Sequence, residues 1–244
     1  MGSLRSFFPP LLLLAMLSEG LAFRPVVIMH GMGNNERGYQ KNIDAIRAAY
    51  PGIYVKALAV YDDKSSYLTH MDKQLAGVVA AIQADDKLSQ GFNFYGESQG
   101  ALLARTYVST HNEPPVHNLV ALCGPQNGVG ECPSVEVPGI KQACGDLGSD
   151  LDIYKWPFCS FCSYWRGVDE AKYLDKSQWL AAVNNDRFNQ TGGMNETFRR
   201  NMVSLNKYMV TYAERDEVVQ PPKSAWHTYW RWGDYGRSAV MNLS

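Results

Sequence analysis

The sequence predicts an α/β protein in which a mostly parallel sheet is wound with helices. Between residues 24 and 123, short apolar runs alternate with longer amphipathic segments, and continuously apolar runs are typical of parallel strands buried on both faces. A Gly-x-Ser-x-Gly segment joins one of these runs to a helix-forming stretch. The chain has 244 residues, enough for one sizeable core, and we expect a single domain over residues 23–244.

The first strands and helices follow from the spacing of apolar residues. Residues 24–29 and 53–60 are short, β-branched runs, which predict strands. Residues 39–50 have apolar side chains at helical spacing and end at a Pro-Gly pair, so we expect a crossover helix. Residues 66–84 are expected to form one longer amphipathic helix. Its apolar stripe consists of Leu68, Met71, Leu75, Val78, Val79 and Ile82.

Ser98 lies on the turn between an apolar strand and a helix that begins at Gln99. A serine hydroxyl is a poor nucleophile at neutral pH, and hydrolases place such a serine on a sharp strand-to-helix turn flanked by glycines. The N–H groups and positive end of the following helix then face the negative charge that forms during attack. The pattern indicates a nucleophile, with an ordinary glycine-rich loop as the alternative.

A second candidate for the same chemistry follows the first strand. The segment His30-Gly31-Met32-Gly33 stands at the carboxyl end of that strand, where hydrolases of this architecture place the second donor of an oxyanion hole. We expect that donor to be the backbone N–H of Met32. His30 is interpreted as a residue that shapes the loop rather than as a base.

The regular alternation stops after a strand predicted at residues 117–123. An insertion of about residues 124–206 follows, and the strand pattern resumes at residues 207–213. Because insertions of this size often cover an active site, we expect its helices and loops to cap Ser98. Its aromatic residues either line a groove for an acyl chain or give the insertion a small core of its own. They are Tyr154, Trp156, Phe158, Phe161, Tyr164 and Trp165.

Asp216 stands in the loop after the strand predicted at residues 207–213. Hydrolases of this architecture have the chain order Ser, Asp, His, and their acid follows a late strand. Such an acid orients a histidine and stabilises its charged form. Glu214 and Glu217 are competing carboxylates, and a solvated charged turn is the alternative for all three.

The N-terminus has the pattern of an export signal. A basic residue precedes an apolar run at residues 7–17, and Gly20-Leu21-Ala22 forms a small-x-small cleavage site, so we expect residues 1–22 to be a signal peptide. The apolar run has about half the roughly 20 residues that a transmembrane helix needs. Met1-Gly2 also begins a myristoylation pattern, which the adjacent apolar run disfavours.

Sequons and charge agree with a lumenal protein that does not bind nucleic acid. We expect glycans at Asn189 and Asn195, and a further sequon begins at Asn242. Sequons are glycosylated only on a secretory route. The chain has 23 basic and 24 acidic residues and no polybasic run, so it has no overall electrostatic attraction for nucleic acid.

The five cysteines leave one unpaired if the others form bridges in an oxidising compartment. Cys132 and Cys144 bracket a loop with proline and glycine and are the first pair expected. Cys159 and Cys162 lack the strand–helix setting of a redox motif and the second pair of a zinc site, so they form a structural bridge or are reduced packing residues. Cys123 is expected to be a small buried residue.

Six segments carry a family resemblance: Val27-Ile28-Met29-His30-Gly31-Met32-Gly33, Pro51-Gly52-Ile53-Tyr54-Val55, Leu88-Ser89-Gln90-Gly91-Phe92-Asn93, Gly96-Glu97-Ser98-Gln99-Gly100, Gly124-Pro125-Gln126-Asn127-Gly128-Val129 and Asn195-Glu196-Thr197. The chain resembles the palmitoyl-protein thioesterases, lysosomal α/β hydrolases that remove long-chain fatty acyl groups from cysteine. The resemblance covers about residues 25–235. It implies an α/β-hydrolase fold with an insertion that caps the site.

The resemblance also implies roles for individual residues. Ser98 matches the nucleophile, and the backbone N–H groups of Met32 and Gln99 match the oxyanion hole. Asp216 matches the acid of the catalytic triad. The pair Cys132 and Cys144 matches a disulfide of the family.

One family feature has no counterpart in this chain. The family's catalytic histidine sits in a Gly-Asp-His segment after a final strand, which is absent here, and residues 238–244 bear no family likeness. We therefore expect the C-terminal strand and helix to be missing and the chain as given to be inactive. His227 follows Asp216 too closely to leave room for the intervening helix and strand. The remaining candidates fit helix or strand-edge positions: His70, His111 and His117.

The resemblance implies a serine thioesterase that hydrolyses palmitoyl thioesters of lipidated proteins through an acyl-enzyme. A general lipase or carboxylesterase is one alternative, because the turn at Ser98 does not distinguish oxygen from sulfur leaving groups. A catalytically inactive acyl-binding relative is the other. The expected partners are S-acylated proteins or peptides and fatty acyl thioesters, with no cofactor, metal ion, nucleic acid or transmembrane segment. The implied location is the secretory pathway, either the lysosome or the secreted fraction.

Overall fold

The computed structural model does not describe every part of the chain. The signal peptide expected at residues 1–22, the cysteine Cys144 and the sequon residue Asn189 lie outside the described residues. The described residues are 23–133, 153–156, 158–187, 190, 192–234 and 240–242.

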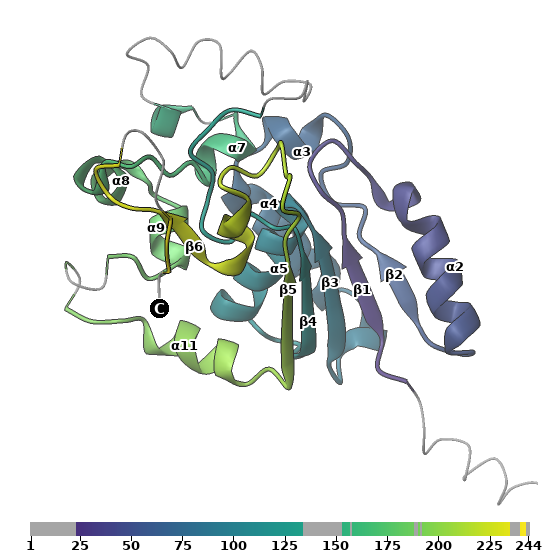
Figure 1. Ribbon diagram of the computed structural model, residues 1–244. Helices are drawn as coiled ribbons and strands as arrows, with labels where there is room; N and C mark the ends of the chain where they lie inside the picture. Colours follow the sequence, from purple (N-terminus) through teal and green to yellow (C-terminus); the bar gives the residue numbers. More distant parts are fainter. Residues whose placement is uncertain are drawn as a thin grey trace, which may run out of the picture.

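Five strands form a central sheet in the order β2-β1-β3-β4-β5 (Figure 1). The strands are β1 (Val26–Met29), β2 (Val55–Ala57), β3 (Phe92–Glu97), β4 (Val116–Leu122) and β5 (Lys207–Thr211). Each neighbouring pair in this sheet is parallel, which confirms the predicted sheet. Because parallel strands end at the same edge, the segments that follow β1, β3 and β4 meet there.

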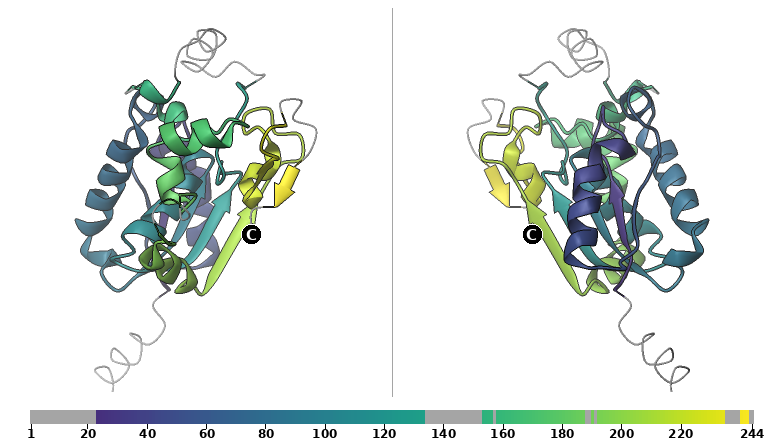
Figure 2. Two further views of the ribbon diagram at one scale, coloured as in Figure 1. Left: turned by 90° about the vertical axis from the view of Figure 1, so that its left-hand side faces the viewer. Right: turned by 90° about the vertical axis from the view of Figure 1, so that its right-hand side faces the viewer.

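Helices pack on both faces of this sheet (Figure 2). On one face, Ile28 and Val55 pack with residues of α2 (Gln40–Ala49) and of the preceding short helix η2 (Glu36–Tyr39). On the other face, α4 (Met71–Gln83) and α5 (Gln99–Thr110) form the larger core cluster with the strands. Neighbouring residues of β1 therefore face opposite layers, as the alternation of side chains along a strand requires.

The prediction of one helix over residues 66–84 is wrong. The segment forms two helices, α3 (Ser65–Leu68) and α4, because His70 caps the second one: its Nδ1 accepts from the backbone N–H of Asp72 at 3.4 Å. Leu68, expected on the apolar stripe, is 51% exposed. The strand expected at residues 53–60 contains only β2, which lies at the sheet edge and pairs with β1 alone.

The described part of the insertion between β4 and β5 consists of short helices. They are η4 (Ile153–Lys155), α7 (Ser160–Ser163), α8 (Glu170–Lys176), α9 (Leu180–Val183) and α11 (Glu196–Val203). Helix α7 lies beside α3, and α11 packs on α5 (Figure 1). Within the described ranges, no helix combines the length and the apolar character needed to cross a membrane.

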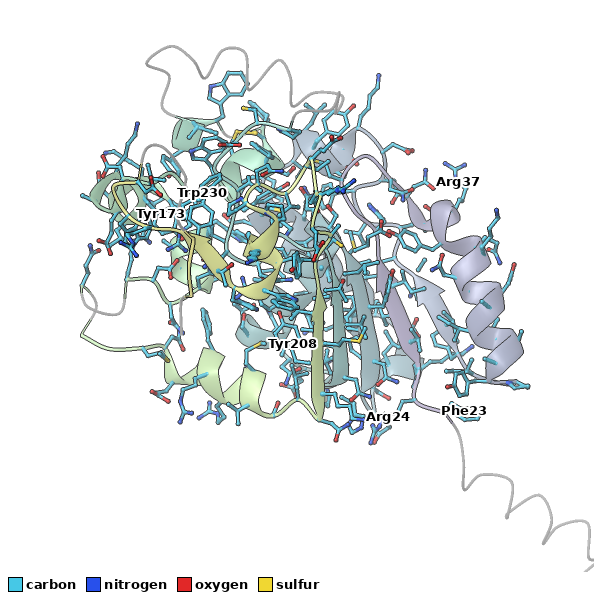
Figure 3. The ribbon with its side chains drawn as sticks, viewed as in Figure 1. Phe23, Arg24, Arg37, Tyr173, Tyr208 and Trp230 are labelled. Carbon is cyan, nitrogen blue, oxygen red and sulfur yellow. A yellow bond between two sulfur atoms is a disulfide. The ribbon has the colours of Figure 1, made fainter. Side chains whose placement is uncertain are left out.

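A buried arginine joins the insertion to the last part of the chain. Arg166 is 2% exposed, and its guanidinium lies 4.7 Å from the ring centroid of Tyr173 and 4.5 Å from that of Trp232. Tyr173 is labelled in Figure 3. Cation–π contacts of this kind are strengthened when they are desolvated. The remaining short elements are η3 (Asp86–Leu88), η5 (Pro222–Trp226) and the antiparallel pair β6 (Thr228–Trp230) and β7 (Val240–Asn242).

Candidate active site

Ser98 occupies a strained turn between β3 and α5. Its backbone has φ 52° and ψ −125°, a conformation that costs a non-glycine residue on the order of 1–3 kcal/mol. The turn is held on both sides, because the Ser98 N–H donates to the Leu122 carbonyl at 2.8 Å and the Ser98 carbonyl accepts from the Ala101 N–H at 2.9 Å. The hydroxyl makes no capping hydrogen bond to α5. The Ser98 hydroxyl is therefore not used to cap its own helix.

The two glycines that flank Ser98 allow a close approach of backbones. A Cβ atom on Gly96 would stand 2.5 Å from the Gly100 carbonyl oxygen and 2.6 Å from the Cα of Ala101. A Cβ atom on Gly100 would collide with the backbone carbonyls of Met29 and His30. Helix α5 can therefore begin directly against the ends of β1 and β3, which is the physical reason for glycine at both positions.

Ser98 lines a cavity of about 320 Å³ that also reaches Met32 and Asp216. The fold thus brings together three residues that the sequence placed on three separate loops. The volume lies near the lower end of the roughly 300–1,000 Å³ typical of small-molecule sites. The other lining residues are Gly31, Asn34, Glu97, Leu122, Cys123, Val218 and Val219.

Of the two residues expected to form an oxyanion hole, Met32 lines the Ser98 cavity, whereas Gln99, which follows Ser98 directly, does not. Gln99 is the first residue of α5, so its N–H has no acceptor within the helix. The loop that carries Met32 is fixed on either side, because the Gly33 N–H donates to Ser66 Oγ at 2.7 Å and the Asn34 N–H donates to the Gly31 carbonyl at 3.3 Å. Two such donors suit the binding of a negatively charged oxygen.

Of the three candidate carboxylates, Asp216 reaches the Ser98 cavity. Its Oδ1 accepts from the backbone N–H groups of Val218 at 2.9 Å and Val219 at 2.8 Å, so the side chain is held in the loop after β5. Glu214 and Glu217 are exposed and do not line this cavity. Asp216 is therefore the carboxylate of the three that shares a cavity with Ser98.

None of the five histidines lines the Ser98 cavity. His30 is buried, with Nδ1 at 2.9 Å from the Gly31 carbonyl and Nε2 at 2.9 Å from Asp62 Oδ1, which fits the role of shaping the loop. His227 Nε2 lies 3.0 Å from the hydroxyl of Tyr208, which is labelled in Figure 3. The other three are His70 at the start of α4, His111 after α5 and His117 in β4.

Two titratable residues of the cavity, Cys123 and Glu97, were not predicted from the sequence to take part in the site. The expectation that Cys123 is buried is wrong: it is a free, partly exposed thiol, and its backbone has a positive φ of 48°. Burial raises the pKa of the Cys123 thiol, and the carboxylates of Asp216 and Glu97 raise it further. Glu97 Oε2 accepts from the hydroxyl of Tyr39 at 2.6 Å. The position of Cys123, directly after a parallel strand, was the available signal.

The aromatic residues of the insertion do not line the Ser98 cavity. Phe161 and Tyr164 are 2% and 3% exposed and belong to the main core cluster, whereas Phe158 is 71% exposed. Phe161 and Tyr164 therefore extend the core that the sheet and its helices share, and they form neither a separate core of the insertion nor the wall of the Ser98 cavity. The insertion reaches the site through a polar contact instead, since the Tyr164 hydroxyl donates to Gln99 Oε1 at 3.1 Å.

The described residues include one complete cysteine pair and one cysteine of the other expected pair. Cys159 and Cys162 form a disulfide, which selects the structural bridge from the two options left open by the sequence. Cys132 is disulfide-bonded, whereas its expected partner Cys144 lies outside the described residues. In the described part of the chain, no group of three or more His, Cys, Asp or Glu residues is arranged to hold a metal ion.

Comparison with known families agrees with this geometry. Residues 25–243 match the sequence profile of the family described as Palmitoyl protein thioesterase. The chain belongs to the palmitoyl protein thioesterase family. It is therefore a thioesterase-type hydrolase with an α/β-hydrolase fold, which confirms the resemblance and the fold class expected from the sequence.

Named palmitoyl-protein and lysosomal thioesterases resemble the chain. It is 34% identical to Palmitoyl-protein thioesterase 3 of Dictyostelium discoideum, over 90% of this chain and 75% of that protein. It is 27% identical to Palmitoyl-protein thioesterase 1 of Caenorhabditis elegans, over 97% and 83%. It is 24% identical to Lysosomal thioesterase PPT2 of Homo sapiens, over 92% and 74%.

Solved structures show only a distant likeness. The thioesterase RedJ of the prodiginine pathway in Streptomyces coelicolor matches with a TM-score of 0.39 and 17% identity, over 54% of this chain and 57% of that one. This likeness is too weak to inform on function. The assignment rests on the family match, the parallel sheet and the turn at Ser98.

Proposed function

We propose that the chain is a serine thioesterase that hydrolyses long-chain fatty acyl thioesters, palmitoyl thioesters above all, from cysteines of lipidated proteins. The observation that carries the proposal is that Ser98, on its strained turn, shares one cavity with Met32 and Asp216. The printed names of the relatives, palmitoyl-protein and lysosomal thioesterases, support the substrate class and a secretory route that ends in the lysosome.

In this mechanism Ser98 Oγ attacks the thioester carbonyl carbon and loses its proton to a base. The backbone N–H groups of Met32 and Gln99 hold the negative oxygen of the tetrahedral intermediate. When the intermediate collapses, the C–S bond breaks and the cysteine sulfur leaves with a proton. Water then attacks the acyl ester on Ser98, which releases the fatty acid and restores the hydroxyl. Asp216 stabilises the positive charge of the base.

A second candidate function is acyl binding without hydrolysis. The positions of the five histidines, all outside the Ser98 cavity, favour it. None of them lines the Ser98 cavity, and among the described residues the titratable groups that do are Glu97, Cys123 and Asp216. Without a base, Ser98 keeps its proton at neutral pH. The cavity would then hold an acyl thioester with only the oxyanion donors to promote attack, which are worth about a thousandfold over water.

One experiment separates these functions. The parent, Ser98→Ala and a control variant, Ser89→Ala, are compared on a palmitoylated cysteine peptide and on the matching oxygen ester. Ser89 is a suitable control because its hydroxyl bonds the Asp86 carbonyl in an exposed turn. We expect Ser98→Ala to lose thioester hydrolysis, commonly by about a millionfold when a triad nucleophile is removed, and Ser89→Ala to keep it.

Other results of this experiment would indicate a different nucleophile or a different function. Residual activity of Ser98→Ala within about tenfold of the parent would exclude Ser98 as the nucleophile, given the size of effect expected. Equal hydrolysis of the oxygen ester would indicate a general lipase or carboxylesterase. Binding of a non-hydrolysable palmitoyl thioether by a parent that does not hydrolyse the peptide would establish the acyl-binding relative.

The same proposal includes features of a lumenal glycoprotein. We propose a bridge between Cys132 and Cys144, glycans on Asn189 and Asn195, and removal of residues 1–22. The lumenal compartment favours disulfides and permits glycosylation. Alkylation of both Cys132 and Cys144 in the native mature protein, read by peptide mass spectrometry, would exclude the bridge.

A further inference from the structure

One buried hydroxyl touches both residues of the proposed oxyanion hole. Tyr164, which follows α7 and is 3% exposed, donates from its hydroxyl to Gln99 Oε1 at 3.1 Å. The same oxygen lies 3.9 Å from Met32 Sδ. Because a hydroxyl has one proton, the amide oxygen takes the hydrogen bond and the thioether sulfur packs beside it. No pattern in the sequence links Tyr164 to either residue.

The Gln99 side chain is fixed at both ends of its amide. Gln99 is 2% exposed, and its Nε2 donates to the Ser66 carbonyl at 2.9 Å and to Gln74 Oε1 at 3.0 Å. Tyr164 supplies the hydrogen bond to the remaining atom, Oε1. Removal of that hydroxyl takes a partner from a buried acceptor, which strongly favours rearrangement of the side chain.

The loop that carries Met32 is tied to the same network. The hydroxyl of Ser66, which is fully buried, accepts from the Gly33 N–H at 2.7 Å and donates to the Asp63 carbonyl at 2.6 Å. The carbonyl of Ser66 is the acceptor for Gln99 Nε2. Tyr164 therefore contacts Gln99 by a hydrogen bond and Met32 by packing, and Ser66 is hydrogen-bonded both to Gly33, the neighbour of Met32, and to Gln99.

We propose that Tyr164 is a positioning residue that holds the backbone N–H groups of Met32 and Gln99 in the geometry of an oxyanion hole. This inference rests on the proposed function. Tyr164 does not line the Ser98 cavity, so it acts through the two residues it touches. Oxyanion donors work only when they sit within hydrogen-bond distance of the developing charge, so a small shift of either N–H lowers the rate of acyl transfer.

The test compares Tyr164→Phe with Tyr107→Phe in the full chain. Tyr107 is a matched control, because it is buried in the same core cluster and its hydroxyl makes one hydrogen bond, to the Pro114 carbonyl at 2.8 Å, away from the site. Both variants lose one oxygen, and urea denaturation shows whether they are destabilised to the same extent. The readouts are kcat and KM on a palmitoylated cysteine peptide and NMR order parameters of the Met32 and Gln99 amides.

We expect Tyr164→Phe to lower kcat by about 10- to 100-fold, because loss of an oxyanion donor costs about 100- to 1,000-fold and this change displaces donors without deleting one. The KM of Tyr164→Phe should stay within about threefold of the parent value, since the change does not affect ground-state binding of the substrate. The order parameters of both amides should fall. Tyr107→Phe should leave all of these quantities unchanged.

The outcomes separate this inference from the proposed function. If the parent hydrolyses no more than Ser98→Ala, the proposed function has failed, and the order parameters alone decide whether Tyr164 holds the two amides. Unchanged order parameters in Tyr164→Phe overturn the inference, as does an equal change in Tyr107→Phe. In an active parent, a rise in KM with kcat unchanged also overturns it.

Discussion

Gly31 and Ser98 lie so close together that a Cβ atom on Gly31 would stand 3.1 Å from the Cβ of Ser98 and 3.8 Å from its Oγ. The two residues follow neighbouring strands, β1 and β3, at the same edge of the sheet. The loop with Met32 and the turn with Ser98 are therefore packed without intervening atoms. A methyl group at Gly31 can fit only if Ser98 or Glu97 gives way by a few tenths of an ångström.

Replacement of Gly31 by Ala should reduce both stability and hydrolysis. Ser98 cannot give way easily, because its strained backbone is fixed by hydrogen bonds to Leu122 and Ala101. Overpacking at such a site costs typically about 1–3 kcal/mol. Gly167→Ala is the control, because a Cβ atom there has no neighbour nearer than 4.0 Å. Urea denaturation would compare the stabilities of the Gly31→Ala and Gly167→Ala variants, and kcat would compare their activities. Equal stability and equal kcat in the two variants would contradict the close packing of Gly31 against Ser98.

Added imidazole should speed acylation of Ser98. The cavity of about 320 Å³ contains Ser98 and Asp216 but no histidine ring, so a free imidazole can enter and take the serine proton. We expect the rate of palmitoyl thioester hydrolysis by the parent to rise with imidazole concentration. General-base catalysis contributes roughly 100- to 10,000-fold when a base is positioned, and a diffusing base should recover a small part of that factor.

Two variants test whether that acceleration occurs in the cavity. Ser98→Ala should show only the background reaction of imidazole with the thioester. Asp216→Asn should respond less than the parent, because the charge that stabilises imidazolium is lost. A response of Ser98→Ala equal to that of the parent would show that the effect has no connection with this site.

Asn195 should have two separable roles, as a glycan acceptor and as a helix cap. Its Oδ1 accepts from the backbone N–H groups of Thr197 at 3.1 Å and Phe198 at 3.3 Å at the start of α11, and the side-chain nitrogen is the atom that carries an N-linked glycan. Thr197→Ala should remove the glycan and keep the cap. Asn195→Asp should do the same, whereas Asn195→Gln should also lose about 1 kcal/mol of stability.

Gel mobility and urea denaturation of deglycosylated samples distinguish the two roles. All three variants at this sequon should lose the same mobility shift when the protein is made in a secretory host. Only Asn195→Gln should unfold at lower urea. A Thr197→Ala band that migrates like the parent would show that Asn195 carries no glycan.

His227 should make the protein less stable in acid. Burial, and then the charge of Arg105, lowers the pKa of His227 to about 3, whereas an unfolded histidine titrates near about 6.5. Between these values the unfolded state binds a proton that the folded state does not. The free energy of unfolding therefore falls as the pH drops from about 6.5 towards 3, by at most about 1.4 kcal/mol per pH unit from this group.

His227→Asn should flatten that dependence. Asparagine tolerates a left-handed backbone, which this position has, with φ 57°. Urea denaturation at about pH 7 reports the packing lost against Tyr208, and the change on going to about pH 4.5 reports the proton linkage. If the free energy of unfolding depends on pH as steeply in the variant as in the parent, then folding does not lower the pKa of His227.

The strand–turn–helix around Ser98 could be predicted because its signals are local. Apolar runs, flanking glycines and the spacing of helix formers are all contained within a few residues of Ser98. The same holds for the loop at Met32 and for Asp216 after β5. The break between α3 and α4 was missed because it depends on a single capping contact from His70, which the apolar stripe of residues 66–84 conceals.

The sequence by itself determined the parallel sheet, the family and the three loops that carry Ser98, Met32 and Asp216. Only the tertiary structure decided that these loops share one cavity, that Cys123 lines it, and that no histidine does. It alone connected Tyr164 to Gln99. The physical reason is that periodicity and turn chemistry act over a few residues, whereas hydrogen bonds between distant side chains leave no pattern along the chain.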